Sequence, residues 1–212
     1  MTTADTDLKT VIEYYNREAS GYLAKFQDEV YQKPYDKAFL DLFSSQLPPG
    51  GVVLDIGCSS ACQQARYLAS LGHGVAGIDL SEESIRLARG QWTGIELFSM
   101  NMLEMTFPND SFDGVSAFYS FIHIPRRDSE RLLQGVRRVL RPGGRLAIAV
   151  HKGEFEGVLE GYSVFFRSFR NGELDELLTE TGFEVLHRAE RKPLYESEYP
   201  SDRLYYLARK LG

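Results

Sequence analysis

The sequence is poor in several features that mark specialised proteins. Only two of its 212 residues are cysteine, Cys58 and Cys62, and no further cysteine or histidine stands near them at metal-ligand spacing. This argues against a zinc site and a disulfide framework, and it predicts reduced thiols in a cytoplasmic protein without a bound metal. The longest apolar runs are far shorter than the ~20 residues of a membrane-spanning helix. The first residues also lack the basic and apolar segments of a signal peptide, so we expect no membrane contact.

An excess of basic residues is absent as well. The chain has 24 Lys and Arg against 30 Asp and Glu, which gives a formal net charge of −6. Because nucleic-acid binding needs a basic face, neither DNA nor RNA is an expected partner. Hydrophobic residues make up 43% of the chain and charged residues 25%, as is ordinary for a globular domain. The composition leaves the oligomeric state open between a monomer and a homodimer.

The first 46 residues show a helical pattern. Apolar and aromatic residues recur at steps of three and four between Leu8 and Phe26, as on one face of a helix. Pro34 can open a second helix at its first turn, and the Pro- and Gly-rich segment Leu47–Gly51 ends it. The pattern predicts a helical cap or lid over residues 1–46 and a core domain over residues 47–212.

From Val52 onward, short apolar runs alternate with helical segments. Such runs are typical of parallel strands that are buried on both faces. The predicted strands are 52–56, 75–78, 95–98, 112–118, 145–150, 183–188 and 203–208, and the predicted helices are 62–71, 81–89, 129–140 and 171–181. This alternation predicts an α/β fold, a doubly wound Rossmann-like sheet with helices on both faces. No helix separates the last two strands, so one of them is expected to be antiparallel.

Three residues stand where such sheets bind ligands, beyond the carboxyl ends of the strands. Gly57 follows the first strand and permits a sharp turn that brings backbone N–H groups near a ligand. Asp55 ends that strand, where a buried carboxylate needs donors or a cation. Asp79 ends the second strand, where an acid can accept hydrogen bonds from both hydroxyls of a ribose. The alternative, in which Asp79 only caps the next helix, is disfavoured because Ser81 is better placed as the cap.

Five segments follow one another at a characteristic spacing: Val52–Cys58, Gly77–Ser81, Met100–Leu103 with Phe107–Pro108, Ser111–Val115 and Val139–Gly144. Together they resemble the class I S-adenosylmethionine-dependent methyltransferases of the small-molecule type, and the resemblance extends from Tyr14 onward. It implies the strand order 3-2-1-4-5-7-6 with strand 7 antiparallel. It also implies S-adenosylmethionine as the cofactor, S-adenosylhomocysteine as the product and methyl transfer to a small molecule.

The resemblance further implies a set of cofactor-binding residues. Asp79 would hold the ribose, Gly57 and Cys58 would line the methionine part, and Tyr15 and Tyr22 would close a lid over it. The full set is Tyr15, Tyr22, Asp55, Gly57, Cys58, Asp79, Leu80, Asn101, Met102, Leu103, Ala117 and Phe118. Ser59 and Ala61 stand where the family usually has glycines, and this narrows the backbone angles that the loop can adopt.

Methyl transfer requires an aligned acceptor, exclusion of water and, for a hydroxyl or a protonated amine, a base. His123, after the fourth strand, is the best candidate for that base, although a histidine there can equally pack and bond the backbone. Insertions at about 151–170 and 192–201 are expected to form the acceptor pocket, with His151, Phe165 and Tyr195 as candidate substrate residues. Their aromatic character suits a hydrophobic or aromatic acceptor, unless these rings belong to the core or to a dimer surface.

Other functions stay open at this point. A catalytically silent protein that binds S-adenosylmethionine, or serves as a scaffold, would carry the same motifs. An NAD(P)-dependent oxidoreductase is less expected, because Ser59 and Cys62 stand where its fingerprint has glycines. A nucleic-acid methyltransferase is disfavoured by the charge and by the segment Ala117–Ser120, which lacks the expected pair of prolines. Neither the acceptor molecule nor its accepting atom can be read from the sequence.

Overall fold

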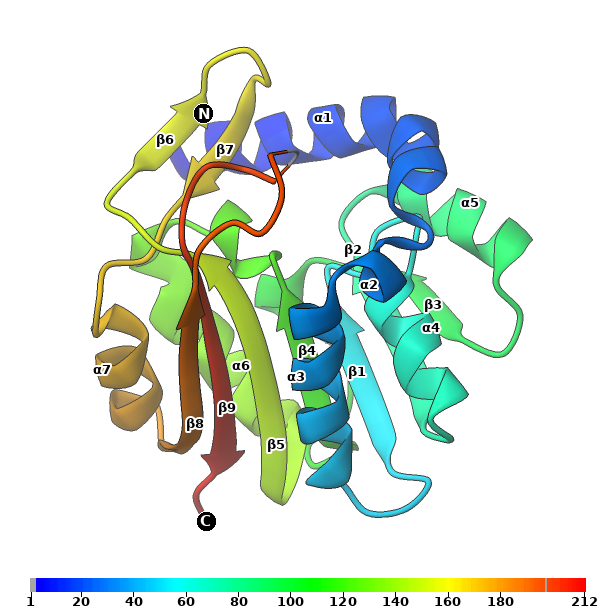
Figure 1. Cartoon of the computed structure of the whole chain (residues 1–212), viewed down its shortest axis with the longest axis vertical. Coiled ribbons are helices and arrows are strands. Elements are labelled where there is room, and N and C mark those ends of the chain that lie inside the picture. Colours follow the sequence, from blue (N-terminus) through cyan, green and yellow to red (C-terminus); the bar gives the residue numbers. More distant parts are fainter. Residues whose placement is uncertain (1–2, 197) are drawn as a thin grey trace.

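A seven-stranded mixed sheet forms the centre of the molecule (Figure 1). The computed structural model describes residues 3–196 and 198–212. In spatial order the strands are β3 (Glu96–Ser99), β2 (Gly74–Asp79), β1 (Val52–Ile56), β4 (Phe112–Phe118), β5 (Leu140–His151), β9 (Arg203–Lys210) and β8 (Phe183–Arg191). Strand β9 runs antiparallel to both of its neighbours, whereas the other pairings are parallel. The predicted order, with the seventh strand reversed, is therefore confirmed.

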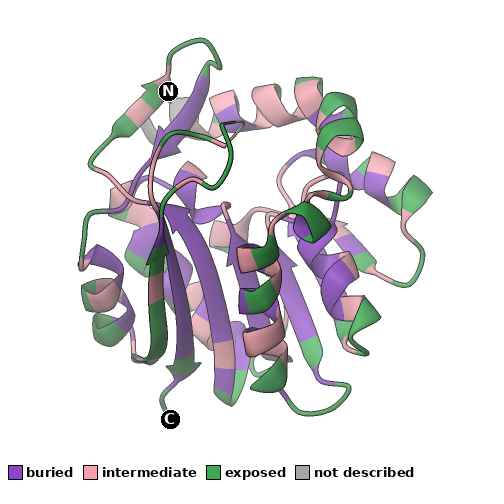
Figure 2. Cartoon of the chain, viewed as in Figure 1, coloured by how far each residue is buried: buried purple, intermediate pink, exposed green. Residues whose placement is uncertain are grey.

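Helices cover both faces of this sheet. On one face lie α3 (Pro34–Ser45), α4 (Gln63–Ser70) and α5 (Glu82–Gln91), and on the other lie α6 (Ser129–Val139) and α7 (Glu173–Glu180). In β5, Ile148 packs into the core of one face and its neighbour Ala149 into the core of the other, because successive side chains of a strand point to opposite faces. The central strands are buried along most of their length (Figure 2), which explains their apolar sequences.

Two elements differ from the sequence prediction. Strand β5 begins at Leu140 rather than at residue 145, because Leu140 pairs with Phe112 before the chain bulges and pairing resumes between Arg145 and Gly114. The insertion at 151–170 contains a separate antiparallel hairpin, β6 (Glu156–Leu159) and β7 (Val164–Arg167). This hairpin lies beside the N-terminal helix (Figure 1).

The N-terminal segment divides into two parts. Helix α1 (Thr3–Phe26) crosses the edge where the parallel strands end and contacts α5 and β7 (Figure 1), and the short α2 (Glu29–Gln32) follows it. Helix α3 instead packs on the sheet through Phe39, Leu40 and Phe43, which are almost fully buried. The predicted cap over residues 1–46 is thus restricted to α1 and α2, because the apolar side of α3 belongs to the core.

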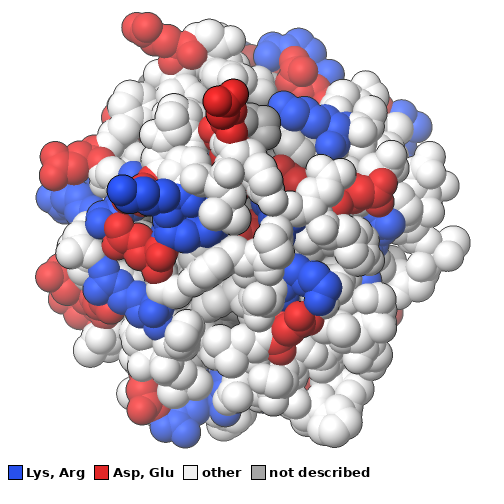
Figure 3. Space-filling view, viewed as in Figure 1, with Lys and Arg blue, Asp and Glu red and all other residues white. Residues whose placement is uncertain are grey.

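Short 3-10 turns follow two of the strands: η1 (Met102–Glu104), η2 (Phe121–His123) and η3 (Arg126–Asp128). Within residues 3–196 and 198–212, no helix combines the length and the apolar character needed to cross a membrane. The same ranges hold no group of three or more His, Cys, Asp or Glu that could bind a metal ion. Basic and acidic side chains are interspersed over the face seen in Figure 3.

Candidate active site

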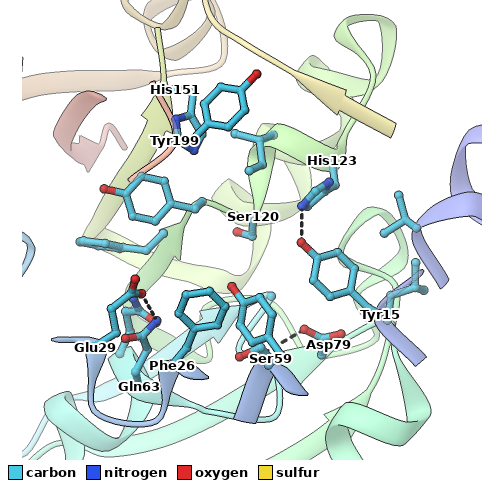
Figure 4. A pocket seen from close by; sticks show the side chains of 18 of the residues that line it. Tyr15, Phe26, Glu29, Ser59, Gln63, Asp79, Ser120, His123, His151 and Tyr199 are labelled. Carbon is cyan, nitrogen blue, oxygen red and sulfur yellow. Dashed lines mark hydrogen bonds between the residues drawn. The ribbon is translucent and has the colours of Figure 1, made fainter. Parts of the chain in front are cut away.

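A cavity of about 870 Å³ lies beneath α1, at the carboxyl ends of the central strands. Its wall comes from α1, α2, the loops after β1 to β4, the end of β5 and the segment between β8 and β9. Asp79 and the loop after β1 form one side, which we call the Asp79 end; His151 and Tyr199 form the other, the His151 end (Figure 4). Parallel strands end at the same edge of a sheet, and this is why the motifs meet here.

The loop after β1 depends on Gly57. Its backbone has a φ of +79°, and a Cβ at this position would lie 2.4 Å from the Cβ of Ser120, so that only glycine fits. The N–H groups of Gly57 and Cys58 both donate to the carbonyl of Ile78, at 2.8 and 3.0 Å. Ser59 adopts a left-handed φ of 56° without being glycine. The loop therefore keeps a tight shape despite one of the two departures from the family pattern.

Asp79 lies on the cavity wall and is held by backbone groups. One carboxylate oxygen accepts the N–H of Ser59 and the other that of Ser81, each at 2.9 Å. Ser81 itself caps α5 by accepting the N–H of Ser84, so Asp79 is not the helix cap. Burial raises the pKa of Asp79 above its usual value, while these hydrogen bonds act in the opposite direction. Each oxygen keeps a lone pair that can accept a further donor.

Leu80, Asn101 and Met102 line the same end of the cavity. The side-chain carbonyl of Asn101 accepts the N–H of Leu103 at 3.0 Å and so caps η1. The amide NH₂ group of Asn101 and the second lone pair of its carbonyl are left for a ligand. Leu103 itself stands outside the cavity lining.

Other predicted cofactor residues lie behind the wall rather than on it. Asp55 is buried below the loop, where it accepts the Ser116 hydroxyl at 2.6 Å, and burial raises its pKa to about 7. The Cys58 side chain packs against Gly77, where an added Cβ would lie 2.9 Å from its sulfur. Ala117 belongs to the core. These residues shape the loop from below, whereas Phe118 reaches the cavity.

His123 connects the lid helix to the hairpin. Its Nδ1 lies 2.8 Å from the carbonyl oxygen of Phe165, and its Nε2 lies 2.7 Å from the hydroxyl of Tyr15 (Figure 4). Because a carbonyl can only accept, Nδ1 carries the proton and Nε2 accepts the proton of Tyr15. Burial lowers the pKa of His123 to about 4. In this arrangement its lone pair is used by the lid and is not available to an acceptor, so its role as a base stays a prediction.

Helix α1 closes the cavity through several further contacts. Asn16 accepts the hydroxyl of Ser81 at 2.8 Å, and the carbonyl of Ala19 accepts the hydroxyl of Ser60 at 2.7 Å. The side chains of Tyr15, Tyr22 and Phe26 line the cavity in a row along the helix. The predicted alignment of Tyr15 and Tyr22 on one helix face is observed, with their ring centroids 5.9 Å apart.

The His151 end has a different composition from that expected. His151 and Tyr195 line it as predicted, but Phe165 packs with Val11 and Val164 in a small core beneath α1. Its aromatic lining comes instead from Tyr199, in the insertion 192–201 that was expected to reach this pocket, and from Tyr119, which the sequence did not single out. Tyr119 follows β4 with a left-handed φ of 56°, an uncommon conformation for a bulky residue and one that is concentrated at functional sites.

Ion pairs hold the segment between β8 and β9 in place. Arg191, at the end of β8, donates to both carboxylate oxygens of Glu198 at 2.8 Å, and it also approaches Asp36 of α3 at 3.4 Å. Burial opposes ionisation of Glu198, but the hydrogen bonds from Arg191 prevail and hold its pKa at about 2. Lys33, Ser120 and Arg203 also reach the cavity. No motif in the sequence distinguished these residues from ordinary surface or loop positions.

A doubly wound sheet with a reversed seventh strand, a glycine turn after β1 and an acid after β2 defines the class I methyltransferase architecture. Comparison with known proteins agrees. Residues 53–144 match the family model of a methyltransferase domain. An O-methyltransferase, resE, from Aspergillus sclerotiorum is 33% identical over 150 residues, which are 65% of this chain and 56% of the relative. Residues 53–144 therefore match a methyltransferase domain, and the chain is similar in sequence and fold to S-adenosylmethionine-dependent methyltransferases.

Solved structures show the same fold. A SAM-dependent methyltransferase from Methanosarcina mazei superposes with a TM-score of 0.71 at 25% identity, covering 80% of this chain and 97% of the other. The 1,6-didemethyltoxoflavin-N1-methyltransferase of Burkholderia thailandensis, solved with S-adenosylhomocysteine, superposes with a TM-score of 0.72 at 21% identity. The superposition covers 94% of this chain and 88% of the other. The chain spans about half the length of the curated relatives that it matches first.

Proposed function

We propose that this protein transfers a methyl group from S-adenosylmethionine to a small-molecule acceptor. The observation that carries the proposal is a single cavity with two unlike ends, one lined by Asp79, Leu80 and Met102 and the other by aromatic and polar side chains around His151. A volume of about 870 Å³ is near the upper end of the ~300–1,000 Å³ of small-ligand sites. It therefore has room for a cofactor and an acceptor together.

The residues of the Asp79 end suit S-adenosylmethionine. The free lone pairs of Asp79 match the two hydroxyls of a ribose, while Leu80 and Met102 offer apolar contacts to a purine. The turn at Gly57, where a side chain would collide with Ser120, allows a ligand to approach the backbone closely. When bound, S-adenosylmethionine supplies an activated methyl group on a sulfonium. The residues of the chain then have to align the acceptor and exclude water, and the position of α1 over the cavity is suited to the latter.

A hydrophobic or aromatic acceptor is favoured by the lining of the His151 end. Tyr119, Tyr195 and Tyr199 offer flat apolar surface there, which suits a planar molecule. The name of the relative resE, an O-methyltransferase, supports oxygen as the accepting atom. The relative covers only part of this chain, so we treat the accepting oxygen as part of the proposal.

Two measurements test the proposal. Calorimetry with S-adenosylhomocysteine should show binding that Asp79→Asn weakens by ~10–100-fold, since one oxygen that accepts a ribose hydroxyl becomes an NH₂ group. Glu180→Gln, an exposed carboxylate at the end of α7, is the control and should bind as the original chain does. NADH should not bind.

Mass spectrometry then follows the formation of S-adenosylhomocysteine from S-adenosylmethionine with a panel of phenols, catechols, quinols and amines. Turnover with at least one acceptor is expected. Binding of the cofactor without turnover across the panel would favour the alternative of a silent binding protein. Absence of any cofactor binding would contradict the proposal altogether.

A further inference from the structure

The ring of His151 lies among aromatic side chains at one end of the cavity. Ring centroids of Tyr119, Tyr199 and Phe166 are 5.4, 5.2 and 5.5 Å from that of His151. Tyr119 and Tyr199 also line the cavity. Aromatic walls favour a planar ligand, because stacking and edge contacts add to the burial of apolar area.

Two polar atoms, one at the His151 end and one between the two ends of the cavity, have no hydrogen bond to the described part of the chain. Nδ1 of His151 is hydrogen-bonded to the Ser201 hydroxyl at 2.8 Å, and Nε2 has no hydrogen bond to any described residue. The Ser120 hydroxyl, in a residue that is 5% exposed, is likewise unpartnered among these residues, and Figure 4 draws it on the cavity wall. Buried polar groups are normally satisfied, so the Ser120 hydroxyl points to a ligand that carries a polar atom, and Nε2 of His151, in a residue that lines the cavity, can bond the same ligand.

The electrostatic environment of this end is positive. Burial first, and then Arg203, Lys33 and His123, hold the pKa of His151 down at about 3, while Glu198 acts in the opposite direction. The three nearby carboxylates are occupied: Glu29 pairs with Lys33 at 2.8 Å, and Glu198 is bound through both oxygens to Arg191. Asp36 approaches Arg191 at 3.4 Å and accepts the hydroxyls of Tyr205 and Tyr119. A negatively charged ligand atom is therefore favoured beside His151.

In this arrangement, neither histidine offers a strong base to an acceptor. The lone pair of His123 accepts the Tyr15 hydroxyl, as described above. His151 stays neutral and is too weak a base to deprotonate an ordinary alcohol. An acceptor that fits this end must be acidic enough to release its proton to water, and an aromatic hydroxyl meets that condition whereas an aliphatic one does not.

We propose that the His151 end binds a planar aromatic hydroxyl compound as its phenolate, with the oxygen against His151 and the ring against Tyr119 and Tyr199. This inference rests on the proposed function and narrows its acceptor. The hydroxyl proton leaves to water as the anion binds. In the transfer, the phenolate oxygen forms a bond to the methyl carbon as the carbon–sulfur bond breaks, and the electron pair of that bond stays on sulfur, which becomes neutral.

The experiment uses 4-nitrophenol, whose phenol and phenolate forms absorb at different wavelengths. The probe is added to protein saturated with S-adenosylhomocysteine, and absorbance is followed from acid to neutral pH. The titration midpoint of the bound probe should lie ~1 pH unit below that of the free probe, as expected beside fixed cations. The non-acidic analogue 4-nitrobenzyl alcohol should bind ~10-fold more weakly or worse.

Variants locate the effect. His151→Phe keeps an aromatic ring but removes the polar contact, and it should weaken binding of 4-nitrophenol ~10-fold. Lys33→Met should move the midpoint of the bound probe back toward the free value. His187→Phe is the matched control, since His187 is exposed on β8 and stands outside the cavity lining; it should titrate as the original protein does.

Two results would overturn the inference: an unshifted midpoint in the original protein, or equal binding by His151→Phe and His187→Phe. If His151→Phe does not fold, Lys33→Met provides the test. A titration midpoint of the bound probe that is the same in Lys33→Met as in the original protein would then contradict the inference. Calorimetry with S-adenosylhomocysteine on the same preparations separates the two proposals. Loss of cofactor binding in the original protein contradicts the proposed function, whereas cofactor binding without a probe shift contradicts only the phenolate.

Discussion

The two ends of the cavity are built in different ways. At the Asp79 end, residues stand directly after adjacent parallel strands, and backbone hydrogen bonds fix them, such as those from Gly57 and Cys58 to Ile78. At the His151 end, α2, the last residue of β5 and the segment before β9 meet, and side-chain ion pairs such as Arg191–Glu198 hold them. The register of the sheet determines the first end, whereas buried electrostatics determines the second. The two ends should therefore be separable by mutation.

The largest expected effect is on the His151 end. Arg191→Met leaves the buried carboxylates of Glu198 and Asp36 without their shared cation, and breaking a buried pair in this way costs ~3–5 kcal/mol of unfolding free energy. Urea denaturation measures the loss. Arg209→Met, which breaks an exposed pair with Glu184 on the same sheet, should cost no more than ~1 kcal/mol. Affinity for S-adenosylhomocysteine should change little in folded Arg191→Met; a loss as large as that of stability would mean that the two ends are coupled.

The Asp79 end should fail at Gly57. Gly57→Ala combines an unfavourable φ with a Cβ that collides with Ser120. We expect the free energy of unfolding to fall by ~2–4 kcal/mol and cofactor binding to be lost. Gly50→Ala is the control, because Gly50 has a similar φ of +69° but open space around its Cβ position. Gly50→Ala isolates the effect of backbone strain, which should lower the free energy of unfolding by ~1 kcal/mol. Similar losses in the two variants would show that the close approach to Ser120 is unimportant.

Acid should weaken both ends through their buried histidines. Burial lowers the pKa of His123 to about 4 and that of His151 to about 3. An unfolded histidine takes up its proton near pH ~6.5, so below that pH the unfolded chain binds more protons than the folded one. Stability is therefore complete above pH ~6.5 and falls toward pH ~4, by at most ~1.4 kcal/mol per pH unit for each histidine.

Denaturation curves between neutral pH and pH ~4.5 measure this slope. His123→Phe should reduce it by the contribution of one histidine, and His187→Phe, at an exposed position, should leave it unchanged. An undiminished slope in His123→Phe would mean that this ring is not buried in its neutral form. Exposed carboxylates also contribute to the change in stability at the acidic end of this pH range. The effect of one histidine is therefore taken from a comparison of variants and not from a single curve.

The smallest effect is expected at the lid, which spans both ends. Tyr15→Phe removes the hydroxyl that donates a hydrogen bond to His123. This should lower the free energy of unfolding by ~0.5–1.5 kcal/mol. Hydrogen exchange of the α1 amides should be faster in Tyr15→Phe than in the original protein, because lids belong to the less stable parts of a fold. Tyr31→Phe, at an exposed position on α2, serves as the control. Equal exchange in α1 of the two variants would show that the hydroxyl does not hold the lid.

Prediction from sequence succeeded where local pattern and chain order carry the information. The strands β1 and β4 have the predicted bounds, and the antiparallel β9 follows from the missing helix before it. Gly57, Asp79 and Asn101 reach the cavity because each follows a strand whose end lies at one edge of the sheet. Ser81 could be identified as the cap of α5 for the same local reason.

Prediction failed where side-chain packing decides. Phe165, which was expected to line the acceptor pocket, packs into the small core beneath α1 instead, and its neighbour Phe166 packs into another core, because successive side chains of β7 point to opposite faces. The pattern of 151–170 gave no register for this hairpin. Cys58 and Ala117 stand at family positions next to the cavity, yet their side chains alternate to the buried side.

The sequence by itself determined the order and direction of the strands and the turn at Gly57, since apolar periodicity, connection length and backbone freedom are local properties of the chain. Only the tertiary structure decided what surrounds each histidine. His123 meets Tyr15 from 108 residues away, and His151 meets Ser201 from 50 residues away. Such partners depend on how distant segments pack against the same edge of the sheet, and no local pattern encodes that distance. The same packing sets the burial and the charges that keep both imidazoles neutral.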